Sequence, residues 1–455
     1  MPSHGDLVEI RLGPLRAWMA CHPDLVRQVL LDTRTFDKGG PLYDRLRPLM
    51  GDGLVTCRHD VYRRQRALLR PDFRPAGVSA HTELMGREAE SACGRWQAGQ
   101  EVDVSAEMLA LTTRVISRVL FSDSLGDEPA AELRDCLAVI VRGLFVRTAV
   151  PVDALFRIPT PANRRYRRAV ARVHAIVGDA VGERRAARSA EPQERPDLLE
   201  TLLAAARGDN GVAAITGQEV HDHLVTLLLT GAESTALCLA SAFDLLARNP
   251  RAERRLHAEV DSVLGGRRPG AEDLPNLPYT RCVVSETLRC RPPGWLFMRV
   301  TTGPARLAGH RLPAGATVLY SPYLLQHDPA SFPDPERFRP ERWLPEGAAG
   351  IPPGAMLPFA SGARRCLGDR FAVAEATVTV AAVAARRRLL HLPGPAEQPR
   401  PGATLGPRSL VMTSVPRPHG PAGPPPRARS LAPRAAAAPL SHEVRTAGDD
   451  GVDDA

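Results

Sequence analysis

The spacing of apolar residues changes along the chain and predicts a mainly helical protein with small sheets. Residues 6–21 alternate between apolar and polar in a strand pattern that is broken once by a Gly-Pro pair. From about residue 79 to residue 265, apolar positions recur at helical spacing between proline-rich or polar interruptions. Residues 305–321 carry a second strand pattern, and residues 371–385 form a last apolar helix. The predicted fold class is therefore mainly α.

The longest predicted helix begins at the capping-box pattern Thr216-Gly217-Gln218-Glu219 and ends at Asn249-Pro250. Its roughly 34 residues would extend for about 50 Å, which is enough to cross a domain. Residues 224–243 are apolar enough to cross a bilayer, with Glu233 as their only charge. Because a carboxylate in the middle of a membrane span is costly, we interpret this segment as a buried central helix and expect no membrane span.

Composition changes after residue 416, where the chain becomes rich in proline and alanine and ends in an acidic cluster. Such a segment cannot bury enough apolar surface to fold. We therefore expect an ordered domain over residues 1–416 and a disordered tail over residues 417–455.

Charge and cysteine content exclude several classes of protein. Lys and Arg number 59 against 51 Asp and Glu, which gives a net charge of +8, and Lys38 is the single lysine. We find no basic stripe interleaved with aromatic residues, so no nucleic-acid binding is expected. Eight cysteines without a CxxC pair are typical of a reducing compartment. With no signal-peptide pattern at the N-terminus, the protein is expected to be cytoplasmic.

The most specific motif is Phe359-Ala-Ser-Gly-Ala-Arg-Arg-Cys366-Leu-Gly368, which fits FxxGxRxCxG and directly precedes the last apolar helix. A thiolate at the start of a helix is stabilised by the helix dipole and by unpaired backbone N–H groups, and it donates strongly to iron. At these residues the chain resembles the cytochrome P450 family of haem-thiolate monooxygenases. The resemblance implies the P450 fold, a large helical domain with a smaller β-rich region, and heme b (iron-protoporphyrin IX) as cofactor.

Each residue of this motif then has an expected role. Cys366 would be the axial ligand of the iron, and Arg364 would pair with a haem propionate. Gly362 and Gly368 would let the backbone turn tightly and approach the flat macrocycle, while Phe359 would shield the sulfur from water. For a single cysteine the ordinary interpretation is a small buried hydrophobe. We adopt that interpretation for six others: Cys21, Cys93, Cys136, Cys238, Cys282 and Cys290.

The long helix carries a second candidate site at Thr230-Gly231-Ala232-Glu233-Ser234-Thr235. Glycine inside a helix costs about 1 kcal/mol relative to alanine, so Gly231 needs a reason, and space over a cofactor is one. In the family this position forms the dioxygen pocket, where an acid and an alcohol relay protons through ordered water. Glu233 and Ser234 take these positions. The family usually has threonine in place of Ser234, and Thr235 is a candidate substitute. The alternative for Glu233 is a buried acid satisfied by its neighbours.

Further residues match positions that hold the family's fold and haem. Glu286 and Arg289, at i and i+3, can pair on one helix face and are expected to form a buried structural triad with Arg342. Tyr62 and Arg66 occupy positions where the family has Trp or His followed by an arginine that reaches the propionates. A further propionate-binding position is taken by Arg299. The alternative for Arg66 and Arg299 is a solvated charged face.

Electrons are expected to come from NAD(P)H through a separate ferredoxin or flavodoxin and its reductase. The haem domain alone needs about 410 residues, and no glycine-rich dinucleotide fingerprint opens a strand–helix unit. Arginines near the cysteine would attract an acidic partner in a salt-dependent way. They are Arg63, Arg64, Arg66, Arg70 and Arg365.

The predicted activity is insertion of one oxygen atom from O₂ into a small or medium hydrophobic substrate. Candidate pocket residues are apolar. They are Leu229, Trp295-Leu296-Phe297, Leu144-Phe145 and Leu155-Phe156. Residues 340–345 and 350–355 resemble bacterial enzymes that hydroxylate terpenoid hydrocarbons, although fatty acids, polyketides and xenobiotics stay open as substrates.

Two other functions also stay open. A peroxide-driven haem-thiolate peroxygenase would need no partner, but such enzymes usually lack the acid–alcohol pair that Glu233 and Ser234 form here. A non-catalytic haem-thiolate sensor would keep Cys366 without turnover.

Overall fold

The computed structural model describes residues 5–12, 15–122, 125–149, 153–186, 197–208, 215–393, 400–401, 404–407 and 409–417. All described residues belong to one compact unit. The tail predicted over residues 417–455 lies outside the described residues, apart from Arg417.

Most of the described chain is helical, as the apolar spacing predicted. The α-helices are α1 (Pro23–Leu31), α2 (Pro41–Met50), α3 (His59–Leu69), α4 (Pro75–Gly94), α5 (Val104–Phe121), α6 (Asp127–Ala149), α7 (Asp153–Arg157), α8 (Pro161–Ala186), α9 (Leu198–Arg207), α10 (Gly217–Arg248), α11 (Pro250–Leu264), α12 (Pro278–Cys290), α13 (Pro322–Gln326), α14 (Pro345–Ala348) and α15 (Asp369–Arg386). Short 3₁₀ turns are η2 (Arg70–Phe73), η3 (Ala271–Asn276), η4 (Pro340–Trp343) and η5 (Gly362–Arg364).

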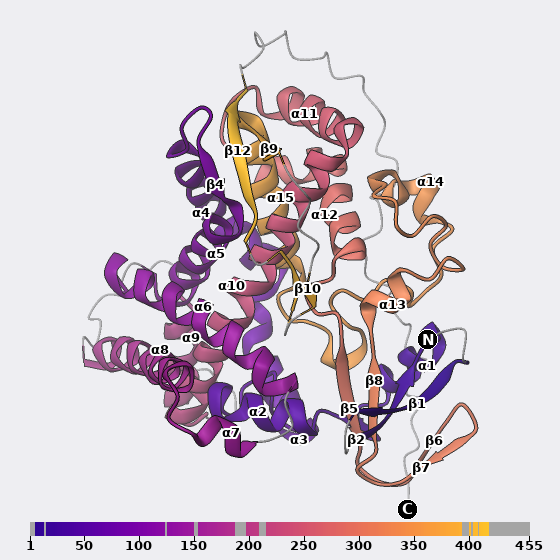
Figure 1. Ribbon diagram of the computed structural model, residues 1–455. Helices are drawn as coiled ribbons and strands as arrows, with labels where there is room; N and C mark the ends of the chain where they lie inside the picture. The colour runs from indigo at the N-terminus through magenta and orange to yellow at the C-terminus, as the bar shows by residue number, and fades with distance from the viewer. Residues whose placement is uncertain are drawn as a thin grey trace, which may run out of the picture. The chain divides into compact units, whose positions relative to one another are not determined.

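Helix α10 is the central element of the helical part (Figure 1). The predicted capping box is present, because the Thr216 side chain accepts from the Glu219 N–H while the Glu219 carboxylate accepts from the Thr216 N–H. Helices α5, α12 and α15 pack against α10. Its most apolar window could span a membrane by length and composition, but 67% of that window is buried inside the protein, as expected for a core helix.

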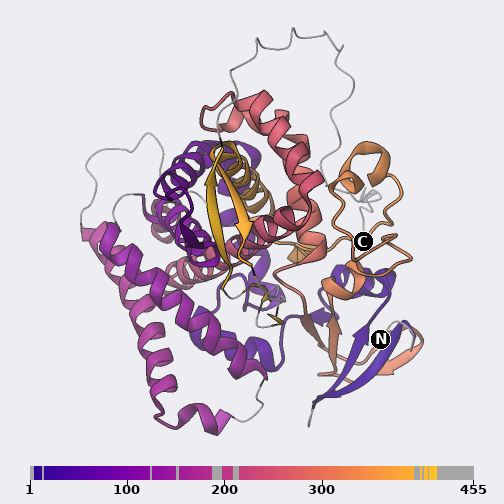
Figure 2. The ribbon, with the colours of Figure 1, turned by 45° about the horizontal axis from the view of Figure 1, so that its top comes forward.

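The β-rich part is one five-stranded sheet with three small ones. The main sheet has the order β1-β2-β8-β5-β3, in which β2 and β8 are parallel. Figures 1 and 2 both show this sheet on the opposite side of the folded unit from α6 and α8. The strands are β1 (Leu7–Leu12), β2 (Leu15–Ala20), β3 (Phe36–Asp37), β4 (Glu101–Asp103), β5 (Phe297–Thr301), β6 (Ala305–Leu307), β7 (His310–Leu312), β8 (Thr317–Tyr320), β9 (Arg387–His391), β10 (Arg400–Pro401), β11 (Leu405–Gly406) and β12 (Val411–Pro416).

The predicted second sheet over residues 305–321 is divided in the structure. Strands β6 and β7 pair only with each other, whereas β8 joins the N-terminal sheet between β2 and β5. All four side chains of β8 are buried, so this strand has core on both faces. A pairing between segments 300 residues apart cannot be read from a local pattern.

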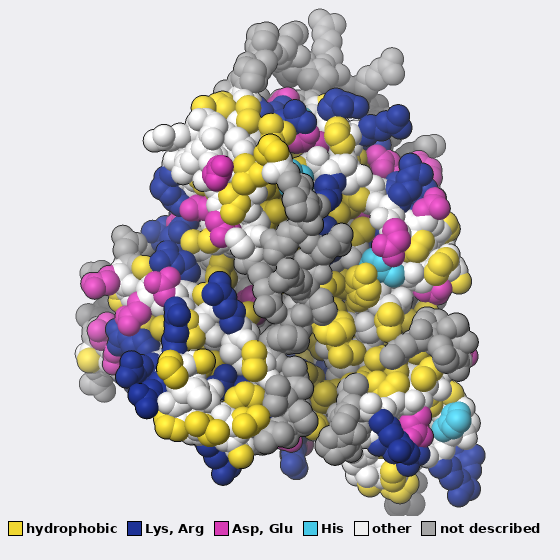
Figure 3. Space-filling view, viewed as in Figure 1, with side chains coloured by type: hydrophobic (Ala, Val, Ile, Leu, Met, Phe, Trp, Pro, Cys, Tyr) yellow, Lys and Arg dark blue, Asp and Glu magenta, His cyan; other side chains and the backbone are white. Residues whose placement is uncertain are grey.

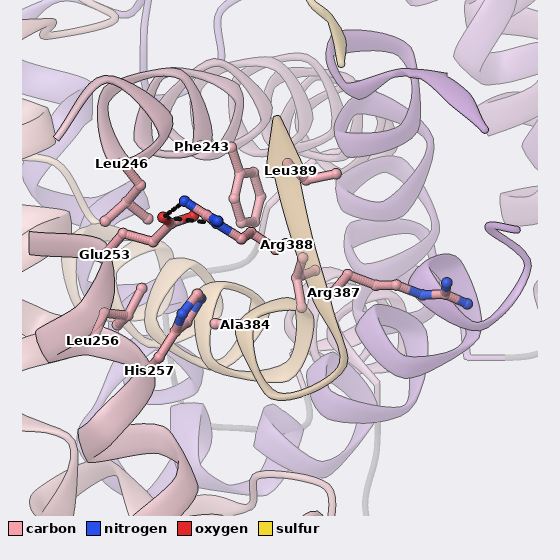
Figure 4. A pocket seen from close by; sticks show the side chains of 10 residues that line it. Phe243, Leu246, Glu253, Leu256, His257, Ala384, Arg387, Arg388 and Leu389 are labelled. Atoms are coloured by element: carbon pink, nitrogen blue, oxygen red, sulfur yellow. Dashed lines mark hydrogen bonds and ion pairs between the residues drawn. The ribbon is translucent and has the colours of Figure 1, made fainter. Parts of the chain in front are cut away.

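A small cavity between α10, α11, α15 and β9 has room for about one water molecule (Figure 4). The Arg388 guanidinium lies 2.8 Å from the Glu253 carboxylate at its edge. None of the predicted site residues lines this cavity, which therefore belongs to the packing of the helices.

The predicted triad fixes α12 to the segment that leads toward the cysteine loop. The fully buried Glu286 carboxylate lies 2.9 Å from Arg289 and 3.2 Å from Arg342. It also accepts hydrogen bonds from the Trp343 indole and the Arg339 backbone N–H, each at 2.9 Å. One carboxylate thus accepts hydrogen bonds from five N–H groups of four residues, and the structure confirms the expected pairing.

Replacing Glu286 by glutamine should destabilise the fold by about 3–5 kcal/mol, because two buried guanidinium groups lose their counter-charge. The measurement is the urea midpoint of the helical circular-dichroism signal. As a control, Glu132→Gln breaks the exposed Arg172–Glu132 pair and should leave the midpoint unchanged. Equal effects of the two substitutions would contradict the structural role of Glu286.

Candidate active site

The cysteine loop is held in a tight reversal between η5 and α15. The Cys366 N–H donates to the Phe359 carbonyl at 2.9 Å, and Phe359 packs against the main hydrophobic core. Gly362 has a φ of +70°, and a Cβ there would lie 2.5 Å from the Leu30 carbonyl oxygen of α1. Only glycine fits this position. The loop therefore presents the thiol just ahead of the first turn of α15.

The Cys366 side chain is accessible although protein surrounds its thiol. The residue is exposed to solvent. Burial nevertheless raises the pKa of its thiol, with the Gly368 backbone and the charges of Arg66 and Lys38 acting in the opposite direction. At Gly368 the nearest atom to an added Cβ is 3.8 Å away, so no described protein contact requires glycine there.

Three cations lie close to one another, the buried Arg299 and Arg364 and the half-buried Lys38, and the charge of Lys38 also acts on the Cys366 thiol. Arg299 of β5 is 2% exposed and donates to the Tyr43 hydroxyl and the Met298 carbonyl, while its Nε has no partner. Arg364 pairs with Asp37 at 2.9 Å, and its Nε is also unpartnered. Burial lowers the pKa of Lys38 to about 7, with the neighbouring charges of Arg299 and Arg364 acting in the same direction. Among the described residues, Arg299 and Lys38 have no carboxylate partner.

This charge distribution fits a haem. Buried cations without counter-charges are costly, and the two propionates of a haem would supply two carboxylates. No contact within the described protein requires glycine at position 368, and the absence of a side chain there leaves space beside the thiol for a flat group. The residues that would hold it are Cys366 at the iron and Arg299, Lys38 and Arg364 at the propionates.

Helix α3 supports the cysteine loop from a second direction. The Arg66 guanidinium donates to the Arg365 carbonyl and to the Tyr62 hydroxyl, each at 2.6 Å. Tyr62 is buried, and the Arg364 guanidinium lies 4.0 Å above its ring. Two residues before Arg66, Arg64 forms an ion pair with Glu219 of the α10 capping box. The structure therefore places Arg66 against the loop backbone, with Tyr62 beneath Arg364.

The α10 segment carries hydroxyl groups next to the half-buried acid Glu233. Thr230 is exposed although most of α10 around it is buried, and the Ser234 hydroxyl donates to the Thr230 carbonyl at 2.7 Å. On the α5 side, the Thr112 hydroxyl donates to the Ala232 carbonyl at 2.8 Å. Two carbonyls of this turn thus accept bonds from side chains, which is typical of a locally distorted helix.

Glu233 is held by a residue far away in the sequence. The Thr404 hydroxyl donates to the Glu233 Oε1 at 2.6 Å. Burial raises the pKa of Glu233 to about 7, and the hydrogen bond from Thr404 acts in the opposite direction. A carboxyl group that titrates near neutral pH can both give and accept a proton under working conditions.

Two residues predicted at this site have other contacts. Thr235 is buried and hydrogen-bonds Glu375 of α15, so its hydroxyl group is engaged on the α15 side of the helix. Successive residues of an α-helix point about 100° apart, and the two hydroxyls cannot share one surface. The missing Cβ of Gly231 points at Ile116 of α5, 3.1 Å away. Close packing of α5 therefore explains this glycine better than space over a cofactor does.

The pocket candidates are only partly brought together. Leu229 is buried, and Leu296 and Phe297 are half-buried, in places consistent with an apolar lining. Leu155, by contrast, is 48% exposed and lies on the protein surface. The side chain of Phe145 lies outside the described part of the chain.

Sequence reasoning missed three residues of this site: Lys38, Asp37 and Thr404. Lys38 had a visible signal, because it is the only lysine in a chain that otherwise uses arginine. Asp37 and Thr404 had none, since each meets its partner only through the tertiary fold.

Comparison with known proteins agrees with this geometry. The Cytochrome P450 family profile matches residues 1–416. The fold is that of a solved structure described as the cytochrome P450DA heme domain, with a TM-score of 0.80, 23% identity and coverage of 91% of this chain and 90% of that one.

Relatives from Streptomyces are more similar in sequence. Cyclooctatin synthase of Streptomyces melanosporofaciens is 45% identical, covering 92% of this chain and 90% of its own length. Cyclooctat-9-en-7-ol 5-monooxygenase of the same species is 45% identical over 87% and 84%. Pentalenene oxygenase of Streptomyces avermitilis is 38% identical over 92% of both. On a match of this extent, the chain belongs to the cytochrome P450 family, and it is a haem-dependent monooxygenase.

Proposed function

We propose that this enzyme inserts one oxygen atom from O₂ into a terpenoid of small or medium size, using electrons from NAD(P)H delivered by a separate redox partner. The observation that carries the substrate class is the identity of 38–45%, over about nine-tenths of the chain, to enzymes that oxygenate terpenoids. The half-buried apolar residues Leu296 and Phe297 support a hydrophobic substrate held mainly by contact area.

The chain's own residues have distinct tasks in this reaction. When bound, the haem supplies the iron at which O₂ is activated. Cys366 is the proposed ligand of that iron, and Arg299 and Lys38 neutralise the propionates. Glu233 holds a proton near neutral pH, and Thr404 fixes one of its carboxylate oxygens so that the other is free to exchange protons through water. Ser234 adds a hydroxyl on the neighbouring surface of α10.

The acid–alcohol pair also favours O₂ over peroxide as the oxidant. Activation of O₂ takes up two protons that the protein must deliver, whereas hydrogen peroxide brings its own two protons and needs them only moved from one oxygen to the other. A non-catalytic sensor would likewise have no use for Glu233. Turnover with a ferredoxin, its reductase and NAD(P)H, compared with turnover on hydrogen peroxide alone, distinguishes the three functions.

We also propose that an acidic ferredoxin or flavodoxin docks near α3, in the cytoplasm. Of the five arginines expected there, Arg63 and Arg70 are exposed. Arg64 and Arg365 form ion pairs with Glu219 and Asp369, respectively. Arg66 donates to the backbone of the cysteine loop. The docking surface is therefore smaller than the sequence indicated.

Replacing Cys366 by serine should abolish the thiolate-type absorption of the reduced carbon-monoxide complex, because an alcohol is a much weaker donor to iron. Some haem should remain bound, since Arg299 and Lys38 are unchanged. The measurement is the absorption spectrum of protein purified from haem-supplied cells, with Cys238→Ser as a control at a buried cysteine. A thiolate spectrum retained in the Cys366 variant would overturn the proposed ligand.

Replacing Glu233 by glutamine should slow product formation by about 10²-fold while leaving haem binding intact. In the wild-type enzyme the donating acid form is lost as the pH rises through about 7, so the rate should fall above that pH. The rate of the Glu233→Gln variant should not fall in this pH range. The readouts are product formed per NADPH consumed and the pH profile of kcat; unchanged coupled turnover would exclude the proton-relay role.

Replacing Thr404 by valine removes a hydrogen bond that favours the Glu233 carboxylate, so the pKa of Glu233 should rise further. The falling limb of the kcat profile should then move to higher pH. Thr413→Val, on β12, is a control with no contact to Glu233 and should leave the profile in place. If Thr404→Val did not move the limb, Glu233 would not be the group that titrates.

A further inference from the structure

Helices α5 and α10 meet closely beside the turn that carries Glu233. Thr112 on α5 and Ala232 on α10 are both fully buried at this junction. Ile116 follows Thr112 on the same face of α5, and a Cβ at Gly231 would lie 3.1 Å from its side chain. Lys and Arg side chains gather elsewhere on the surface, for example over α6 and α8 at the left of the space-filling view (Figure 3). The junction is an interior contact, so its polar groups must find partners within the protein.

The Thr112 hydroxyl has one proton and three carbonyl oxygens at hydrogen-bond distance. The nearest belongs to Ala232 of α10, at 2.8 Å, while the Met108 and Leu109 carbonyls of α5 itself lie at 3.0 and 3.3 Å. The next residue, Thr113, is also buried, and its hydroxyl donates to the Leu109 carbonyl of its own helix at 2.6 Å. The shortest bond of Thr112 therefore crosses between two helices, whereas the bond of Thr113 stays within one.

A donor from another helix alters the backbone of α10 at Ala232. In an α-helix the Ala232 carbonyl accepts from the N–H four residues later, which here belongs to Ala236. A second donor draws the carbonyl oxygen outward and lengthens that intrahelical bond, which bends the helix locally. Within α10, the Thr230 and Ser234 hydroxyls donate to the carbonyls of Thr226 and Thr230, each at 2.7 Å. The bend at Ala232 differs because it depends on a hydroxyl that α5 supplies.

The Ala232 carbonyl decides where the Glu233 side chain begins. This carbonyl and the Glu233 nitrogen belong to the same planar peptide group, so a shift of one moves the other. The Glu233 carboxylate must in turn reach the Thr404 hydroxyl, 2.6 Å away in a segment outside both helices. Such a hydrogen bond is lost when its two oxygens move apart by about 1 Å. The acid is thus located from two directions, through its backbone and through its carboxylate.

We propose that Thr112 is a positioning residue for oxygenation, whose hydroxyl holds the peptide between Ala232 and Glu233 so that the Glu233 carboxylate stays on Thr404. The proposal rests on the proposed proton-relay role of Glu233 and extends it to a residue of a different helix. Loss of the Thr112 hydroxyl loosens the bond between Thr404 and Glu233. Because that bond favours the carboxylate, its loosening raises the pKa of Glu233.

The test compares Thr112→Val, which keeps the shape of the side chain but removes the hydroxyl, with Thr113→Val as a matched control on the same helix. The readout is the infrared stretch of carbon monoxide bound to the reduced haem, whose frequency responds to nearby charge and should titrate with Glu233. Thr112→Val should raise the midpoint of this titration by at least about half a pH unit. Thr112→Ser, which keeps a hydroxyl, and Thr113→Val should retain the wild-type midpoint.

A second readout is the amount of product formed per NADPH consumed, with the substrate used for the Glu233→Gln variant. Thr112→Val should lower this ratio about three- to tenfold, while the absorption spectrum of the carbon-monoxide complex stays unchanged. Added to Glu233→Gln, Thr112→Val should cause no further loss, because Thr112 acts through Glu233. A merely structural role of Thr112 would lower the ratio equally in both backgrounds and would overturn the proposal.

Two kinds of negative result have different meanings. An unchanged midpoint in Thr112→Val, or an equal shift in Thr113→Val, would reject the positioning role of Thr112 and leave the proposed function standing. A titration that is absent from the wild type, or that persists in Glu233→Gln, would instead remove Glu233 as the proton relay and the positioning role with it. If Thr112→Val does not fold, Thr112→Ala, which introduces no new atoms, provides the same comparison with Thr113→Ala.

Discussion

Buried positive charge is the constraint on which the active site depends. Arg299, Lys38 and Arg364 lie close enough to lower the pKa of the lysine, yet Asp37 is the one carboxylate that pairs with any of them among the described residues. Protein interiors do not tolerate such an imbalance without a partner. The two propionates of a bound haem would supply the missing counter-charge. Haem binding and the stability of the haem-facing core are therefore linked.

The two sides of the site are built from opposite kinds of residue. On the cysteine side, charged groups and backbone bonds fix the loop, with Arg66 on its carbonyl and Gly362 pressed against α1. On the oxygen side, hydroxyl groups and a single carboxyl act inside an apolar helix, and Glu233 is brought to a pKa near 7 by burial. The loop that carries Cys366 is thus held rigidly, whereas Glu233 can gain or lose a proton. This division suits a reaction in which the proposed metal ligand stays fixed while protons move.

Local sequence patterns predicted those features whose cause is local. The capping box at Thr216, the cysteine motif and the Glu286–Arg289 pair each depend on residues within one or two helical turns. What the sequence could not show are contacts made by the tertiary fold, such as Thr404 with Glu233 and β8 between β2 and β5. The contacts of two predicted residues have the same origin. Thr235 and Gly231 lie in the right motif, but which neighbour each one faces is decided by how α5 and α15 pack on α10.

Helix α3 has a consequence for how the two faces of the protein communicate. Its 11 residues include Arg66, which donates to the carbonyl of Arg365 next to the proposed iron ligand Cys366, and Arg64, which pairs with Glu219 of the α10 capping box. A short helix moves as a rigid body, so any tilt of α3 must displace the thiol loop and the first turn of α10 together. A partner protein that binds at Arg63 or Arg70 and tilts α3 would thus also displace the first turn of α10, the helix that carries Glu233.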